Sequence, residues 1–182
     1  MHRRGTWPAR RWFLSSASQA KRHTGARGSA QTLGLTGSPV PKSTVALRVF
    51  ADELEPHEVT ALLGCEPTRS YRKGDLVSPG RSAATRKYGM WSLVCADSEP
   101  EAFDQQIQSL LARLTPDLQV WQSLAAEYRV DLFCGYFMSD SNQGFTLSAT
   151  TVSALAARQL EIGFDIYSTE PEDTTPSQER EA

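Results

Sequence analysis

The densest cluster of chemically different side chains lies in the stretch EPTRSYRKGD, residues 66–75. Six of the 11 basic residues that follow residue 43 fall between Arg69 and Lys87, and only Glu66 and Asp75 oppose them, so the segment 66–88 carries about +4. Guanidinium groups bind carboxylates and phosphates through paired hydrogen bonds. The segment 66–88 is therefore predicted to hold an anionic ligand or an acidic protein partner. The alternative is that its cations pair with the domain's own acids or keep a loop solvated.

The residues around this cluster have different expected roles. Gly74 is typical of a turn, in which Asp75 accepts hydrogen bonds from nearby backbone amides. Trp91 alternates with two apolar neighbours, which favours a place in the core, although stacking on a ligand is an alternative. A pocket beside Trp91 would indicate a small ligand, and a flat exposed loop would indicate a protein partner. The predicted binding residues are Arg69, Arg72, Lys73, Asp75, Trp91 and Tyr136.

Known catalytic signatures are absent from the sequence. It contains no P-loop and no G-x-G-x-x-G, and its folded part has a single histidine, His57. A histidine-based metal site or catalytic triad is therefore not expected, and no catalytic residue, metal or cofactor is predicted. One alternative is an enzyme with an unrecognised site around Arg69, Arg72, Asp75 and Tyr136. Another is an immunity-type inhibitor that opposes a basic toxin with its acidic surface.

The charge of the chain is divided unevenly. Residues 1–43 hold eight of the 19 basic residues and none of the 21 acidic ones, so the remainder carries a net charge of −10. A domain this acidic repels polyphosphates, which argues against nucleic-acid binding by the folded part. The three cysteines are widely spaced and form no C-x-x-C, which favours a reducing, cytoplasmic compartment. No apolar run is long enough for a membrane span.

The composition predicts one domain with two extensions. Residues 1–43 are rich in Arg, Ser and Gly and are expected to be disordered, although a targeting segment, a basic arm or a start-site artefact are alternatives. Residues 169–182 form an acidic tail, also expected to be disordered. The folded domain is predicted over residues 44–168.

Hydrophobic periodicity predicts an alternation of strands and helices in this domain. A proline at the first turn, a glycine after the last turn and a serine cap mark three of the helix ends. Strands are expected over 44–52, 90–95, 130–137, 145–147 and 160–167, and helices over 56–63, 98–114, 118–128 and 148–156.

Two segments resemble each other: residues 54–62 and 147–155 share Leu, Val, Ala and Leu at equivalent positions. This repeat predicts an α+β fold of duplicated, ferredoxin-like β-α-β halves, with one mainly antiparallel sheet packed on helices and a helix pair inserted between the halves. Strands 44–52 and 130–137 are expected to be neighbours, with Leu47, Leu132 and Phe164 buried together. A chance match between helices rich in Leu and Ala is the alternative.

Four motifs in order carry a family resemblance: the stretch 66–75, then GMWSL at 89–93, DLFCGYF at 131–137 and GFTL at 144–147. In these the chain resembles the bacterial domain-of-unknown-function family 4279 (DUF4279) over roughly residues 44–168. The resemblance implies a stand-alone bacterial cytosolic domain with no established activity. It assigns no catalytic residue, and the basic N-terminal extension lies outside it.

Overall fold

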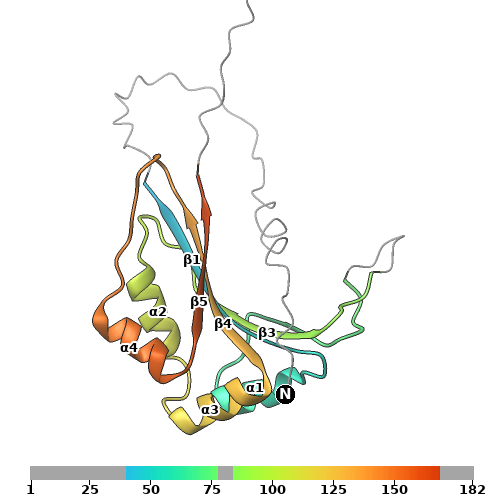
Figure 1. The fold of residues 1–182 in the computed structure, drawn as a ribbon. Coiled ribbons are helices and arrows are strands. Elements are labelled where there is room, and N and C mark those ends of the chain that lie inside the picture. Colours follow the sequence, from blue (N-terminus) through green and yellow to red (C-terminus); the bar gives the residue numbers. More distant parts are fainter. Residues whose placement is uncertain (1–39, 78–83, 169–182) are drawn as a thin grey trace, which may run out of the picture. The chain divides into compact units, whose positions relative to one another are not determined.

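The computed structural model describes residues 40–77 and 84–168, so the predicted disorder of the two extensions lies outside the described residues (Figure 1). β1 begins two residues before the predicted start of the domain. Within the described ranges the chain forms five strands and four helices. They are β1 Lys42–Ala51, α1 Pro56–Leu63, β2 Arg69–Tyr71, β3 Gly89–Val94, α2 Phe103–Leu111, α3 Leu118–Glu127, β4 Arg129–Phe137, α4 Ala149–Ala157 and β5 Glu161–Tyr167.

The strands form one sheet in the order β2-β3-β1-β4-β5. β1 pairs antiparallel with β3 on one side and with β4 on the other, and this confirms the predicted central neighbours. β2 is antiparallel to β3, but β4 and β5 are parallel. The sheet is therefore mixed, and the prediction of a mainly antiparallel sheet was wrong. The reason is α4, a crossover that returns the chain to the same end of the sheet before β5 begins.

The ferredoxin-like duplication is not confirmed, because the two β-α-β segments are built differently. β1 and β2 are both antiparallel to β3, so they run parallel to each other with β3 between them. β4 and β5 are direct neighbours. The sequence-based prediction overlooked β2, a three-residue strand inside the basic segment. Such a short strand has too few alternating residues for a pattern to reveal it.

All four helices cover the same face of the sheet. Alternate residues of β1, such as Val45 and Leu47, are fully buried beneath them, as is Leu132 of β4. The same apolar cluster includes residues from each helix, among them Phe103 of α2. Figure 1 shows α2 and α4 beside one half of the sheet and α1 and α3 near the other end. The helices therefore contribute core residues such as Val59, Phe103, Trp121 and Leu155, whereas Leu62, Leu118 and Val152 are exposed.

The opposite face of the sheet carries a charged pair at its centre. Arg48 of β1 and Asp131 of β4 are register partners, and the guanidinium donates two hydrogen bonds of 2.7 and 2.9 Å to the carboxylate. The side chain of Arg48 also lies over the ring of Phe133, 4.5 Å from its centroid. Asp131 is only 5% exposed, so its charge needs this partner.

Two local predictions were wrong and one was confirmed. Residues 145–147 form no strand; instead Phe145 packs edge-on against Phe103, with centroids 4.8 Å apart. Phe164 is 36% exposed rather than fully buried, because it lies on the edge strand. Ser148 caps α4 as predicted, since its hydroxyl accepts a hydrogen bond from the backbone N–H of Thr151.

Gly89 provides a test of the packing between β3 and the segment that precedes α1. A Cβ at this position would lie 2.8 Å from the Cβ of Leu54 and 2.9 Å from its carbonyl oxygen. Gly89→Ala should therefore lower the free energy of unfolding by about 1–3 kcal/mol in urea denaturation. Gly163→Ala is the control, because nothing lies within 4 Å of a Cβ there. Equal stability of the two variants would contradict this packing.

Candidate functional site

The basic segment forms a hairpin that extends from the sheet. Beyond Tyr71 and Gly89 the two strands remain connected by backbone hydrogen bonds of 2.8 Å, from Gly74 N–H to the Arg86 carbonyl and from Arg86 N–H to the Asp75 carbonyl. A third bond links Val77 to Ala84. We call residues 72–77 and 84–88 the arm. It extends away from the helices (Figure 1), and its predicted cation Arg81 lies outside the described residues.

A turn at Gly74 gives the arm its local shape. Gly74 has a φ of 89°, in the left-handed region that favours glycine. The carboxylate of Asp75 accepts a hydrogen bond of 2.8 Å from the backbone N–H of Arg72. Both features are those that the sequence predicts for a turn. Asp75 thus stabilises the turn that carries Arg72 and Lys73.

Two of the predicted binding cations pair with acids between β1 and α1. Arg72 donates to Glu55 at 2.6 Å, and Lys73 lies 3.4 Å from Glu53 and 3.6 Å from Asp52. The hydrogen bond to Glu53 raises the pKa of Lys73, with Asp52 adding to the effect. These pairs are solvent-exposed, and water and salt screen exposed pairs so that they contribute little to stability. They therefore present little barrier to exchange for another anion.

Other cations of the segment are placed differently. Arg69 on β2 and Lys87 in the arm are exposed, and neither has an ion pair within the described part of the chain. Arg86 lies over the ring of Tyr71, 4.2 Å from its centroid. Burial raises the pKa of Tyr71 to about 12, with Tyr88 adding to the shift, so this phenol stays neutral at physiological pH.

The arm also exposes apolar surface. Leu76 is 65% exposed and Val77 is 43% exposed, directly after the Gly74 turn. Leu76 faces Thr85 across the arm in an isolated bridge. The sequence-based prediction considered only the charges here and missed these two side chains. Two adjacent apolar residues inside a basic segment could have indicated them.

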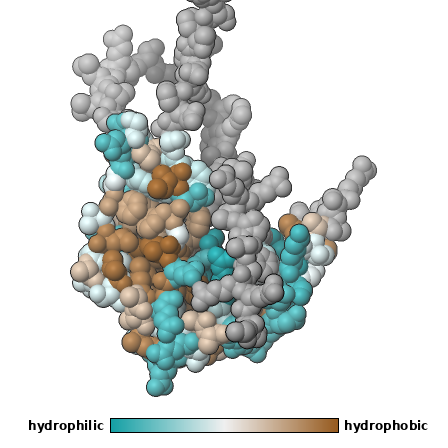
Figure 2. Space-filling model, in the orientation of Figure 1, coloured by the Kyte–Doolittle hydropathy of each residue, from teal (hydrophilic) through white to brown (hydrophobic). Residues whose placement is uncertain are grey.

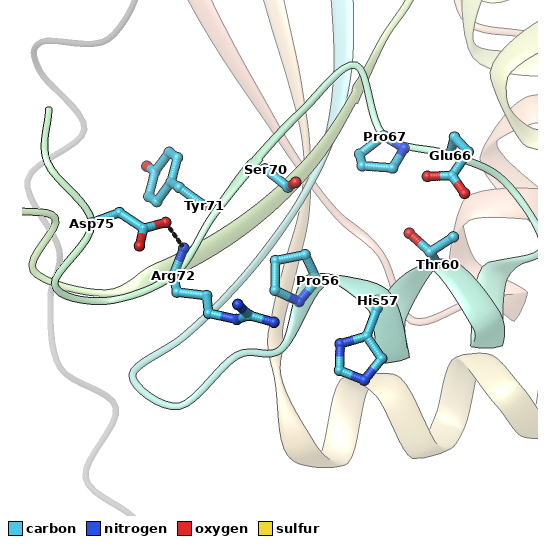
Figure 3. A pocket seen from close by; sticks show the side chains of 9 residues that line it. All are labelled: Pro56, His57, Thr60, Glu66, Pro67, Ser70, Tyr71, Arg72 and Asp75. Carbon is cyan, nitrogen blue, oxygen red and sulfur yellow. Dashed lines mark hydrogen bonds between the residues drawn. The ribbon is translucent and has the colours of Figure 1, made fainter. Parts of the chain in front are cut away.

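A shallow hollow of about 380 Å³ lies between the start of α1 and β2 (Figure 3). Its wall has both signs of charge, since Arg72, Glu66 and Asp75 all line it, so it is not organised around one anion. Thr60 of α1 lines it and accepts a hydrogen bond from the Trp91 indole N–H. The lining residues are Pro56, His57, Thr60, Glu66, Pro67, Ser70, Tyr71, Arg72 and Asp75.

The structure does not bring all six predicted binding residues together. Trp91 is fully buried, and Tyr136 is 1% exposed, packed against Phe103 and Phe145 in the core. Tyr136 belongs to β4, which two strands separate from the β2 residue Arg69, a distance of roughly 14 Å at the usual strand spacing. The alternation of Trp91 with apolar neighbours already favoured the core, whereas Tyr136 was predicted to lie at the site. Arg69, Arg72, Lys73 and Asp75 do lie on one hairpin.

Two general features of the described residues bear on cofactor and membrane use. Across residues 40–77 and 84–168, no three His, Cys, Asp or Glu side chains come together in a way that could hold a metal ion. None of the helices in these ranges has the length and apolar character needed to cross a bilayer.

The comparisons with known proteins agree with the motifs around this hairpin. The model of one family, the domain of unknown function DUF4279, matches residues 41–169. The chain belongs to the DUF4279 family. Searches of curated proteins and of solved structures found no match. In this DUF4279 domain the matched region begins at β1 and ends just after β5, so it includes the whole sheet and the arm.

Tyr136 offers a test of its role. Its buried hydroxyl has no hydrogen-bond partner among the described residues, and an unsatisfied buried polar group costs about 1–3 kcal/mol. Tyr136→Phe should therefore leave the free energy of unfolding unchanged or raise it. Trp91→Phe, which removes the hydrogen bond to Thr60 and part of a buried ring, should lower it. A Tyr136→Phe variant that folds normally but loses binding of a partner would instead assign the hydroxyl to a site.

Proposed function

We propose that this DUF4279 domain is a non-enzymatic binding module that holds an acidic surface of a protein partner with its arm and Arg69. The observation that carries the proposal is the exposed pair Leu76 and Val77, on a hairpin that also carries Arg72, Lys73 and Lys87. Exposed apolar side chains surrounded by charges are typical of protein interaction sites.

A protein partner fits this geometry better than a small anion. Of the cations that the structure describes on this hairpin, only Arg72 lines the adjacent hollow, and the acids Glu66 and Asp75 line it as well. A small anion would need several donors around a single site. A protein surface with an apolar patch and carboxylates around it can contact Leu76, Val77 and the cations at once.

The ion pairs within the domain are compatible with this role. Arg72 and Lys73 are paired with exposed acids, whereas Arg69 and Lys87 have no ion pair in the described ranges. A partner's carboxylates can engage the second pair of cations directly and compete for the first. Such contacts mainly accelerate association and select the partner, and salt weakens them.

The proposed setting is the cytoplasm. The three cysteines are free thiols, and Cys134 is buried in the core while Cys65 and Cys95 are half-buried. Free thiols in this arrangement suit a reducing compartment.

The proposal is tested by capture with matched baits. Full-length protein, Arg69→Glu/Lys87→Glu and Leu76→Ser/Val77→Ser are immobilised, and proteins bound from a lysate of the source cells are quantified by mass spectrometry. We expect the wild-type bait to enrich an acidic protein that both variants lose and that moderate salt elutes. Surface substitutions of this kind usually change stability by less than about 0.5 kcal/mol, so both variants should stay folded.

Arg113→Glu is the matched control, because Arg113 is an exposed cation that follows α2, outside the arm. It should capture the same protein as the wild type. Capture that is equal for all baits would refute the role of the arm. Loss of capture by Arg113→Glu alone would place the binding surface on the helical side.

A further inference from the structure

β5 forms one edge of the sheet. It pairs with β4, and within the described residues no strand lies along its other side. The carbonyl of Tyr167 accepts a hydrogen bond of 2.8 Å from the N–H of Met138, just after β4, so the backbone groups of Tyr167 face β4. Backbone groups alternate in direction along a strand. Those of Ile162, Phe164 and Ile166 therefore face the open edge.

This edge lacks two of the usual forms of protection, although it carries two acids, Glu161 and Asp165. β5 runs for seven residues, EIGFDIY, without a lysine or a proline. Its outward-facing residues include Phe164, which is 36% exposed, and Ile166, which is 56% exposed. Figure 2 shows hydrophobic side chains gathered on the side where α4 and β5 lie in Figure 1. Open hydrogen-bonding groups next to apolar side chains favour the addition of another strand.

The sequence of β5 is complementary to itself in one antiparallel register. Outward-facing residues must oppose outward-facing residues for the hydrogen bonds to form. In a two-fold pair, one residue of β5 lies opposite the same residue of the partner subunit, and the pair is centred on that residue. Centring the pair on Gly163 would place Glu161 opposite Asp165 of the partner subunit. Centring it on Asp165 would place the two copies of this aspartate opposite each other. Both are like-charge pairs, which destabilise a sheet. Centring on Ile162 or Ile166 leaves only three residues of β5 paired.

Centring on Phe164 avoids all of these problems and pairs all seven residues. On the helix side, Ile162 then faces the partner's Ile166, and Phe164 faces the partner's Phe164. On the other side, Glu161 faces the partner's Tyr167 and Gly163 faces the partner's Asp165. Nothing lies within 4 Å of a Cβ built on Gly163, which leaves room for that carboxylate.

We propose that two copies of this chain associate through β5, antiparallel and centred on Phe164, to form one continuous sheet with two-fold symmetry. β2 lies at the opposite edge from β5, so the two arms would lie at the two far ends of the joined sheet. A dimer of this kind presents two binding arms, which strengthens binding to a partner with repeated sites. The association itself does not depend on what the arms bind.

Sedimentation of the full chain over a wide concentration range tests the proposal. The wild type should reach twice the 20.1 kDa mass of one chain. Gly163→Asp places two like-charge pairs in the interface and should raise the dimer dissociation constant about tenfold or more. Gly163→Lys places a lysine opposite the partner's Asp165 and should leave the constant unchanged or lower it. Gly163→Asp/Asp165→Lys should restore association, and Gly144→Asp, at another open glycine, is the control.

The opposite responses of the two Gly163 variants are specific to this register. In a dimer centred on Gly163, the two substituted residues would lie opposite each other, so Asp and Lys would both weaken the dimer.

Hydrogen exchange gives a second readout, since the amides of Ile162, Phe164 and Ile166 should become protected as concentration rises. A monomer at all concentrations overturns the proposal, as does a dimer that neither Gly163 variant alters. Amide protection that does not depend on concentration would also overturn it, because the chain itself would then cover the edge.

Discussion

The pairing of β1 with β3 on one side and β4 on the other is the constraint on which the rest of the domain depends. β1 comes first in the folded chain, yet both partners follow it by tens of residues. Its Val45, Leu47 and Val49 are fully buried under the helices. Because β1 is central, β2 and β5 become the two edges of the sheet. The arm extends from one edge and the open backbone of β5 forms the other.

The placement of all four helices on one face determines the chemistry of the opposite face. No helix of residues 40–77 or 84–168 covers that face, and local contacts between neighbouring strands stabilise it (Figure 1). The two hydrogen bonds between Arg48 and Asp131 join β1 to β4, and the guanidinium also lies over Phe133. Removing Asp131 would leave the partly buried Arg48 without its partner, and removing Arg48 would leave the buried Asp131 with only the longer contact of 3.4 Å to Arg129.

The arm is held in place by weak exposed interactions. Asp75 shapes its turn, and Arg72 and Lys73 contact acids between β1 and α1. Arg86 is instead packed over Tyr71, whose pKa of about 12 keeps the ring uncharged beside the cation. The cations of this segment therefore divide into one that supports the hairpin and several that remain available at its surface. Which cations belong to which group depends on how buried each side chain is. The number of charges in the segment does not show this.

Sequence alone determined the family, the α+β class and most helix and strand positions, because these follow from motifs and from local hydrophobic periodicity. The cap at Ser148 and the turn at Gly74 and Asp75 were also predictable, since each depends on contacts only a few residues apart. Tertiary structure decided the parallel pairing of β5, the short strand β2 and the burial of Tyr136 away from Arg69. It also decided that Phe164 lies on an exposed edge, which the clean alternation of β5 did not indicate. Strand order and partner choice depend on contacts between residues far apart in the chain, and a local pattern specifies which side chains face inward but not which strand lies beside them.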